Sequence, residues 1–300
     1  CSPGPADCSA WHTAQTVTVT WTSPPPGVQT DRCTTSTITI DTAGAPVSCT
    51  WWNSDGARTT SVNVRHDATA PAATASPSRA PDSNGWYNDE LTVAFSGSDG
   101  TSGLAGCTAP RSYAGPDSAS VALTGSCSDV AGNTRGASFG FKYDATAPSA
   151  SGGVSRGPDH NGWYNQGVTV AFSGSDGLSG PVACTGGRNY TGPDSASVTV
   201  NGSCSDQAGN PSGASVSFKY DATPPSASGS PSRGPDSNGW YNQGVTVAFS
   251  GSDGLSGLAA CTADRNYTGP DSASVTVNGS CTDLAGNPRG ASGAFRWEAA

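Results

Sequence analysis

The sequence is poor in charge, in helix-forming residues and in long apolar runs. Methionine is absent, lysine occurs only at Lys142 and Lys219, and charged residues make up 12% of the chain. A chain short of Leu, Glu, Lys and Gln does not favour helices. No apolar run approaches the ~20 residues of a membrane-spanning helix, so no such span is predicted. A net charge of −9 with scattered arginines excludes a surface that follows nucleic-acid phosphates.

The chain is instead rich in Ser, Thr, Ala, Gly and Val, with 40 glycines and 22 prolines among 300 residues. This composition suits short strands joined by many turns. We therefore predict an all-β fold.

A period of 77 residues organises most of the sequence. The pentad NGWYN, followed by a VTVAFSGSDG-type segment, recurs around Trp86, Trp163 and Trp240. A D-A-T-A-P or D-A-T-P-P linker separates the copies, at residues 67–71, 144–148 and 221–225. A weaker, tryptophan-rich copy with Trp11 in the pentad position comes first. The sequence thus predicts four domains, which are residues 1–70, 71–147, 148–224 and 225–300.

Each copy has the pattern of a small β-sandwich. Leu91, Val93 and Phe95 alternate with polar or small residues, as in a half-buried strand. A second alternating segment leads into a hairpin whose turn holds Gly132 and Asn133, residue types that tolerate positive φ. Six or seven strands are expected in ~75 residues, which is small for an immunoglobulin-type sandwich.

The ten cysteines provide covalent support that so small a core needs. Their positions in the repeats predict the pairs Cys33–Cys49, Cys107–Cys127, Cys184–Cys204 and Cys261–Cys281. Cys1 and Cys8 would then pair with each other. A chain that begins Cys-Ser also resembles a bacterial lipoprotein, whose lipid anchor would leave Cys8 unpaired. Five disulfides indicate an oxidising, extracellular compartment.

Taken together, these motifs resemble the bacterial immunoglobulin-like repeats of long secreted and cell-surface proteins. The resemblance rests on the D-x-T-x-P linker, the GWYN entry, the VTVAFSGSD segment and the C-[ST]-D-x-AGN hairpin, and it covers essentially the whole chain. It implies a spacer, stalk, surface appendage or filament component, and no catalysis. Both cysteines of a repeat follow the VTVAF strand, so the antibody arrangement of Trp against the disulfide is not expected.

The linkers predict the arrangement of the repeats. Pro71, Pro148 and the Pro224-Pro225 pair fix φ and favour an extended preceding residue. We therefore expect an elongated, semi-rigid rod.

No catalytic residues are predicted. His12, His66 and His160 stand where other repeats carry Tyr or Ser, and we interpret each as a surface variant. The chain has no HExxH, no GxSxG and no His/Cys spacing typical of zinc sites. The expectation is a protein that is not an enzyme and requires no cofactor.

Calcium is the one ion that the sequence favours. Repeated acids end the SGSD segment (Asp99, Asp176, Asp253) and open the D-x-AGN block (Asp129, Asp206, Asp283), and linker acids lie at the repeat junctions (Asp67, Asp144, Asp221). Carboxylate oxygens from loops suit Ca²⁺. The first copy has lost both acids and carries Pro25 and Trp51 instead. The alternative is that these acids cap turns by accepting backbone N–H bonds.

The tryptophans divide into two groups. A Trp that recurs in every GWYN pentad is typical of a core or hinge plug. The first copy holds half of all eight tryptophans, including the neighbours Trp51 and Trp52. On a strand these two must point to opposite faces, so one is expected to face outward. This pair is a candidate binding surface for a cell-surface glycan or protein, or for self-association into a filament. Adhesion through the first repeat is thus the alternative function, and an enlarged core is the alternative role of the pair.

Overall fold

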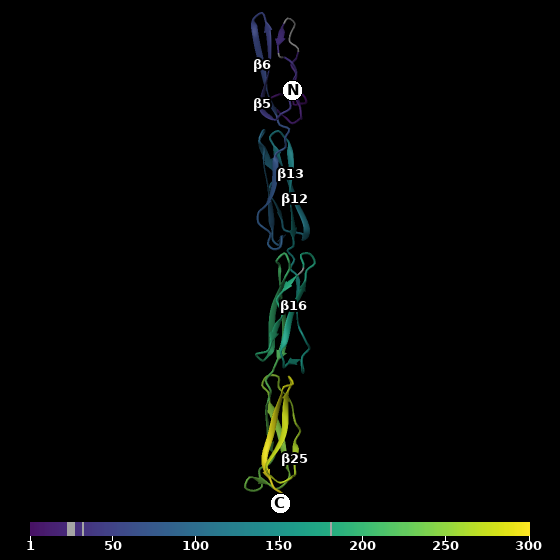
Figure 1. Ribbon diagram of the computed structural model, residues 1–300, viewed down its shortest axis with the longest axis vertical. Coiled ribbons are helices and arrows are strands. Elements are labelled where there is room, and N and C mark those ends of the chain that lie inside the picture. Colours follow the sequence, from purple (N-terminus) through teal and green to yellow (C-terminus); the bar gives the residue numbers. More distant parts are fainter. Residues whose placement is uncertain (23–27, 32, 181) are drawn as a thin grey trace. The chain divides into compact units, whose positions relative to one another are not determined.

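The computed structural model describes residues 1–22, 28–31, 33–180 and 182–300, so Pro25 lies outside the described residues. Within these ranges the chain forms 27 strands and no helix, and therefore no helix that could span a membrane. The all-β fold of tandem Ig-like β-sandwiches is confirmed (Figure 1). The chain divides into two units, Cys1–Thr146 and Ala147–Ala300, and each contains two of the predicted repeats.

The first unit contains thirteen strands. Repeat 1 has β1 (Trp11–His12), β2 (Val17–Val19), β3 (Gln29–Asp31), β4 (Ser36–Ile38), β5 (Thr42–Asn53) and β6 (Gly56–His66). Repeat 2 has β7 (Ala72–Pro77), β8 (Trp86–Tyr87), β9 (Leu91–Ser98), β10 (Leu104–Cys107), β11 (Arg111–Tyr113), β12 (Ser118–Asp129) and β13 (Thr134–Tyr143).

The second unit repeats the seven-strand pattern twice. Repeat 3 has β14 (Ser149–Val154), β15 (Trp163–Tyr164), β16 (Val168–Ser175), β17 (Ala183–Cys184), β18 (Arg188–Tyr190), β19 (Ser195–Ser205) and β20 (Pro211–Tyr220). Repeat 4 has β21 (Ser226–Pro231), β22 (Trp240–Tyr241), β23 (Val245–Ser252), β24 (Leu258–Cys261), β25 (Arg265–Tyr267), β26 (Ser272–Asp283) and β27 (Pro288–Trp297).

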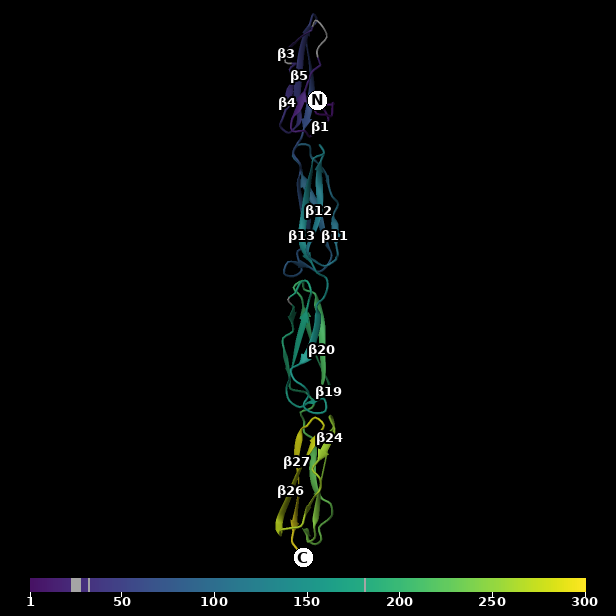
Figure 2. The same ribbon diagram turned by 90° about the vertical axis from the view of Figure 1, so that its right-hand side faces the viewer.

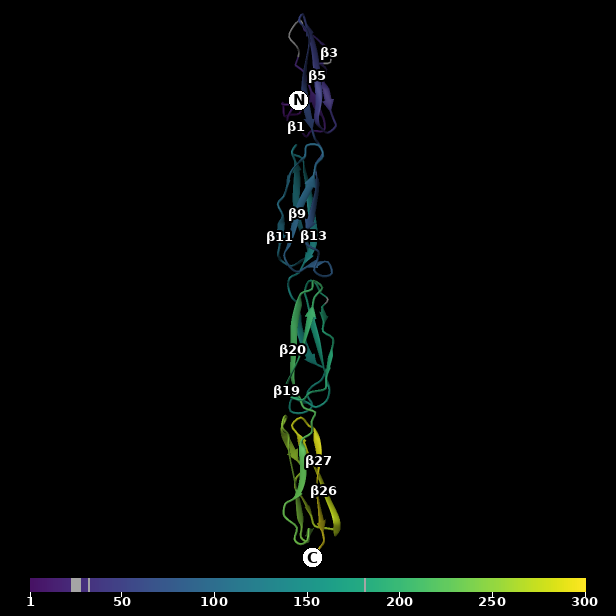
Figure 3. The ribbon, with the colours of Figure 1, turned by 90° about the vertical axis from the view of Figure 1, so that its left-hand side faces the viewer.

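Each of repeats 2 to 4 is a sandwich of a three-stranded and a four-stranded sheet. In repeat 2 the strand orders are β11-β9-β7 and β10-β12-β13-β8, and Figure 2 and Figure 3 show this repeat from opposite sides. Pairing is antiparallel except between β8 and β13, which run parallel. Repeat 1 is a reduced version, with a two-stranded sheet, β2-β4, and a four-stranded sheet, β1-β6-β5-β3.

The core lies between the two sheets of each repeat. In repeat 2 the predicted alternation is confirmed, since Leu91, Val93 and Phe95 of β9 are buried. They pack with aromatic residues of the opposite sheet, including Phe141, whose ring meets that of Tyr87 edge to face at 5.6 Å. Repeats 3 and 4 have equivalent clusters of their own, and the cluster of repeat 1 is built on valines, among them Val17 and Val64.

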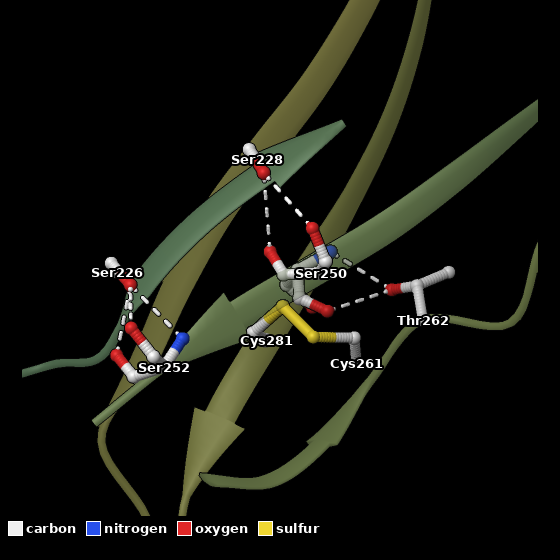
Figure 4. Close-up of a disulfide and its surroundings, with 8 residues drawn as sticks. Ser226, Ser228, Ser250, Ser252, Cys261, Thr262 and Cys281 are labelled. Carbon is white, nitrogen blue, oxygen red and sulfur yellow. Dashed lines mark hydrogen bonds between the residues drawn. A yellow bond between two sulfur atoms is a disulfide. The ribbon is translucent and has the colours of Figure 1, made fainter. Parts of the chain in front are cut away.

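All ten cysteines are paired, in the pairs that the sequence predicts. In repeats 2 to 4 the bridge joins neighbouring strands of one sheet; in repeat 2, for example, Cys107 of β10 stands directly opposite Cys127 of β12. Figure 4 shows the corresponding bridge in repeat 4, between Cys261 and Cys281. The antibody bridge joins two sheets, so this arrangement differs from it as expected.

Hydroxyl groups fill the outward face beside the bridge. The Ser226 hydroxyl lies 2.8 Å from that of Ser252, and the hydroxyls of Ser228 and Ser250 lie 3.1 Å apart (Figure 4). Such cross-strand hydroxyl pairs support a sheet without apolar side chains. They explain how a serine-rich sequence forms stable strands.

Two of the three histidines are buried, contrary to the sequence interpretation. His12 and His66 are each only 1% exposed, so their assignment as surface variants is wrong, whereas His160 is exposed. The reason is that they occupy the positions of Tyr87 and Tyr143, which are buried core residues. Both ring nitrogens of His66 reach backbone carbonyl oxygens, at 2.9 and 2.6 Å. The ring nitrogens of His12 have no hydrogen-bond partner in the described part of the chain.

Replacing His12 with phenylalanine is expected to stabilise repeat 1. A buried polar group without a partner costs about 1–2 kcal/mol, and phenylalanine removes that cost while filling a position that holds tyrosine in the other repeats. Native-state hydrogen exchange of β6 measures the gain. As the matched control, Tyr87→Phe in repeat 2 loses the hydrogen bond from Tyr87 Oη to the Arg79 carbonyl and should give no gain. An unchanged or lower stability of His12→Phe would contradict the prediction.

Candidate metal-binding junctions between repeats

Three acids converge where repeat 3 joins repeat 4. Asp221 follows β20 in the linker, Asp253 follows β23, and Asp283 is the last residue of β26. Each offers a carboxylate oxygen within 4.8 Å of the others. Asp221 and Asp283 are buried, and Asp253 is half-buried. The acids come from three separate segments, so the junction, and not one loop, creates the group.

Backbone hydrogen bonds hold the two acids of repeat 4 in place. Oδ1 of Asp253 accepts the N–H groups of Leu255 at 3.0 Å and Gly257 at 2.8 Å. Its other oxygen accepts no hydrogen bond from the residues that the structure describes. Oδ1 of Asp283 accepts the Asn287 N–H, and Oδ2 accepts the Asn287 side-chain amide, both at 2.8 Å. The alternative role of turn capping is therefore also present, on the same carboxylates.

Repeat 4 also forms hydrogen bonds to the linker that follows repeat 3. The Asn287 side-chain amide donates to the Asp221 carbonyl at 2.9 Å, and the Ser256 N–H donates to Asp221 Oδ2 at 3.2 Å. The Thr223 N–H donates to Asp221 Oδ1 at 3.1 Å. Asp221 is thus bonded both to its own linker and to the next repeat.

The first unit contains the same arrangement. Asp67, Asp99 and Asp129 lie with carboxylate oxygens within 4.8 Å of one another, and Asp67 and Asp129 are buried. The Asn133 amide donates to the Asp67 carbonyl at 2.9 Å, and the Ser102 N–H donates to Asp67 Oδ2 at 3.0 Å. We call these two groups, 67/99/129 and 221/253/283, the junction triads.

The junction triads carry concentrated negative charge. Burial raises the pKa of Asp99, but hydrogen bonds from the N–H groups of Gly103, Thr101 and Ser102 outweigh it, so this pKa lies below the ordinary value of 3.8. Burial likewise raises the pKa of Asp253, and its backbone hydrogen bonds lower it by more. Among the described residues, no ion pair involves a triad acid. Three close carboxylates without a cation repel one another, and a hard cation with oxygen ligands relieves this repulsion.

The structure brings the predicted metal residues together in pairs, Asp99 with Asp129, Asp176 with Asp206, and Asp253 with Asp283. The linker acids Asp67 and Asp221 complete two of these groups. The sequence signals their importance only by their regular position in the D-A-T-[AP]-P linker, where Asp144 also stands.

The tryptophans of the NGWYN pentads differ in exposure. Trp86 and Trp163 are 5% and 6% exposed, which fits the predicted core or hinge plug, whereas Trp240 is half-buried. The Lys142 ammonium lies 5.4 Å from the Trp86 ring centre, and that of Lys219 lies 5.5 Å from the Trp163 ring centre. These cation–π contacts fix the short edge strand against the last strand of the repeat.

Trp51 and Trp52 lie near the end of β5 in repeat 1. They stand opposite Arg58 and Ala57 of β6. Trp52 is 37% exposed and Trp51 is less so, which agrees with the expectation that one of the pair faces outward. The structure thus identifies Trp52 as the outward member of the candidate binding surface, which stays a prediction.

Comparison with known proteins gives structural likeness only. No protein-family model and no curated protein matches the chain. A tetra-tandem repeat from the extending region of a large adhesion protein is 18% identical, with 89% of this chain and 86% of that chain covered and a TM-score of 0.32. An adhesin described as Ca²⁺-stabilised, which helps an Antarctic bacterium reach out and bind ice, is 15% identical over 95% of each chain, with a TM-score of 0.40. The I67–I69 fragment of the titin I-band is 12% identical over 66% of this chain and 83% of that chain, with a TM-score of 0.32. At these scores the properties of those proteins are not transferred to this chain.

Proposed function

We propose that the chain is an extracellular, non-catalytic spacer of tandem Ig-like repeats, part of a stalk, surface appendage or filament, whose repeat junctions bind Ca²⁺. The observation that supports the proposal is the junction triad, in which a buried linker acid meets two acids of the following repeat. Five disulfides in one chain support an oxidising, extracellular location.

A cation at a junction triad would act as a cross-link between neighbouring repeats. Asp221 belongs to the linker after repeat 3, whereas Asp253 and Asp283 belong to repeat 4. One ion that binds all three removes the freedom of the linker and neutralises the repulsion between the acids. Extracellular Ca²⁺ modules of this kind bind with dissociation constants of about 10⁻⁴–10⁻³ M, which suits a structural ion. In the absence of the ion, the same charges loosen the joint.

Removing Ca²⁺ is therefore expected to destabilise the protein. At a free ion concentration 100 times the dissociation constant, a site that only the folded state forms contributes about 2.7 kcal/mol. For repeats of this size, that corresponds to a melting temperature about 10 °C or more above that in chelator. Calorimetric melting of the full chain, with Ca²⁺ and with excess chelator, measures the difference, and calorimetric titration measures binding directly.

A matched pair of variants separates the triad from general charge effects. Asp253→Asn/Asp283→Asn removes two triad carboxylates and should abolish the Ca²⁺ response of the junction before repeat 4. Asp264→Asn removes an exposed acid of the same repeat outside the triad, and its response should equal that of the parent chain. Identical melting of the parent chain with and without chelator would refute the calcium part of the proposal.

A further inference from the structure

In the second unit, two asparagines of repeat 3 form hydrogen bonds with the D-x-A-G-N hairpin of repeat 4. The Asn161 side-chain amide donates to the Leu284 carbonyl at 3.0 Å, and the Asn165 amide donates to the Ala285 carbonyl at 2.9 Å. Asn161 has a φ of 47° and begins the turn that presents its amide to the hairpin. These hydrogen bonds use backbone carbonyls, so they recognise the shape of the hairpin and not its side chains.

Glycine shapes the hairpin at this contact. Gly286 has a φ of +91°, which an L side chain rarely adopts. It lies against the exposed side chain of His160, beside the two asparagines, and a Cβ there would lie 2.0 Å from His160 Cδ2 and displace that side chain. Repeat 4 has Ser237 at the position of His160, so of these groups only the asparagines are common to both repeats.

Repeat 4 has residues of the same type at the end that corresponds to the hairpin-binding end of repeat 3. Asn238 (φ 46°), Trp240 and Asn242 correspond to the groups of repeat 3, and Glu298 follows β27 where Asp221 follows β20. These four residues line one hollow of about 370 Å³. We call this set of four residues the repeat 4 end face.

The residues of the repeat 4 end face are more exposed to solvent than their counterparts in repeat 3. Asp221 is fully buried, whereas Glu298 is exposed. Trp163 is 6% exposed, whereas Trp240 is only half-buried. Over the described ranges, the side-chain amides of Asn238 and Asn242 find no hydrogen-bond partner. The face thus offers two amide donors, an indole and a carboxylate to solvent.

We propose that the repeat 4 end face binds a further Ig-like repeat through the D-x-A-G-N hairpin of that repeat. The argument is that the same groups in repeat 3 already bind such a hairpin, with backbone carbonyls as acceptors. The hairpin of repeat 1 is not of this type, because it has Trp51 and Asp55 where repeat 2 has Asp129 and Asn133. The partner is therefore a repeat of the type of repeats 2 to 4. Where the calcium proposal holds, Glu298 supplies the third acid to the two of the partner.

Extending the full chain by one repeat tests the proposal. Residues 223–300 are appended after Ala299, so that Glu298 and the new repeat have the spacing of Asp221 and repeat 4. The appended copy carries Trp240→Phe, which makes the original Trp240 peptide distinct in mass spectrometry. Hydroxyl-radical footprinting then measures oxidation of Trp240. Docking is expected to slow this oxidation several-fold relative to the 300-residue chain, while Trp163 in the same molecule is unchanged.

Asn238→Ala/Asn242→Ala in the extended chain is the matched variant. It removes two exposed amides and should return Trp240 oxidation to the rate of the unextended chain. Protection of Trp240 that persists in chelator supports the end face even if the calcium proposal fails, because the asparagine contacts need no ion. Equal oxidation of Trp240 in the extended and unextended chains, with and without Ca²⁺, would overturn the proposal. Protection that the double variant retains would also overturn it.

Discussion

Replacing Cys261 and Cys281 together by alanine is expected to lower the free energy of unfolding of repeat 4 by about 3 kcal/mol. The bridge closes a loop with a sequence separation of 20 residues, and in the chain-entropy model a loop of this size contributes about 3 kcal/mol. The effect is large for repeat 4 because a domain of this size buries a modest core. Native-state hydrogen exchange of β26 and β27 reports this repeat separately from the others.

Ser228→Ala provides the control for the cysteine variant. Ser228 lies near the bridge, on the exposed face of β21, and shares a hydroxyl contact with Ser250, but it closes no loop (Figure 4). Loss of that exposed contact is expected to change stability by well under 1 kcal/mol. Exchange in β26 and β27 that is as slow in the double cysteine variant as in the parent chain would show that the bridge does not stabilise the repeat.

The sandwich and its bridges could be predicted from the sequence because their signals are local or periodic. The alternate spacing of Leu91, Val93 and Phe95 predicts a buried face, since alternate residues of a strand lie on the same face. The cysteine pairs of repeats 2 to 4 follow from the 77-residue period, because each of these copies holds one pair at the same two positions. Neither inference requires knowledge of how distant segments meet.

The junction triads were only partly predictable. Asp253 and Asp283 lie in segments whose repetition suggests a common task, but the burial of Asp221 depends on how the linker contacts Ser256 and Asn287 of repeat 4. The burial of His12 could not be predicted from its residue type. A polar residue in a divergent copy suggests exposure, but His12 stands at the position of Tyr87, which is buried in both repeats.

The need for glycine at one position of the third strand in each seven-stranded repeat could not be predicted from the sequence. Gly251, in the segment VTVAFSGS, looks like a residue of the following turn, but it lies inside β23. An added Cβ would lie 2.2 Å from the Ser226 carbonyl oxygen and 3.2 Å from Cys281 Sγ. Gly97 and Gly174 have the same surroundings in repeats 2 and 3. The glycine lets the cystine and the first strand of the repeat both pack closely on this strand.

Gly251→Ala is therefore expected to destabilise repeat 4 by about 3 kcal/mol, at the upper end of the range for overpacking. The nearest obstacle is a backbone oxygen of β21, which cannot rotate away as a side chain could. Relief would require β21 to move from β23, and this breaks the pairing of Ala227 with Gly251. Hydrogen exchange of β21 and β23 measures the loss.

Gly254→Ala is the control for this effect, because no atom lies within 4 Å of the Cβ position there and its φ is not in the left-handed region. Its stability should stay within about 0.5 kcal/mol of the parent chain. If Gly251→Ala proves as stable as Gly254→Ala, β21 can move from β23 at no cost, and the close packing of the cystine, β21 and β23 does not stabilise the repeat. If only Gly251→Ala is destabilised, that contact limits which residues the position accepts in all three seven-stranded repeats.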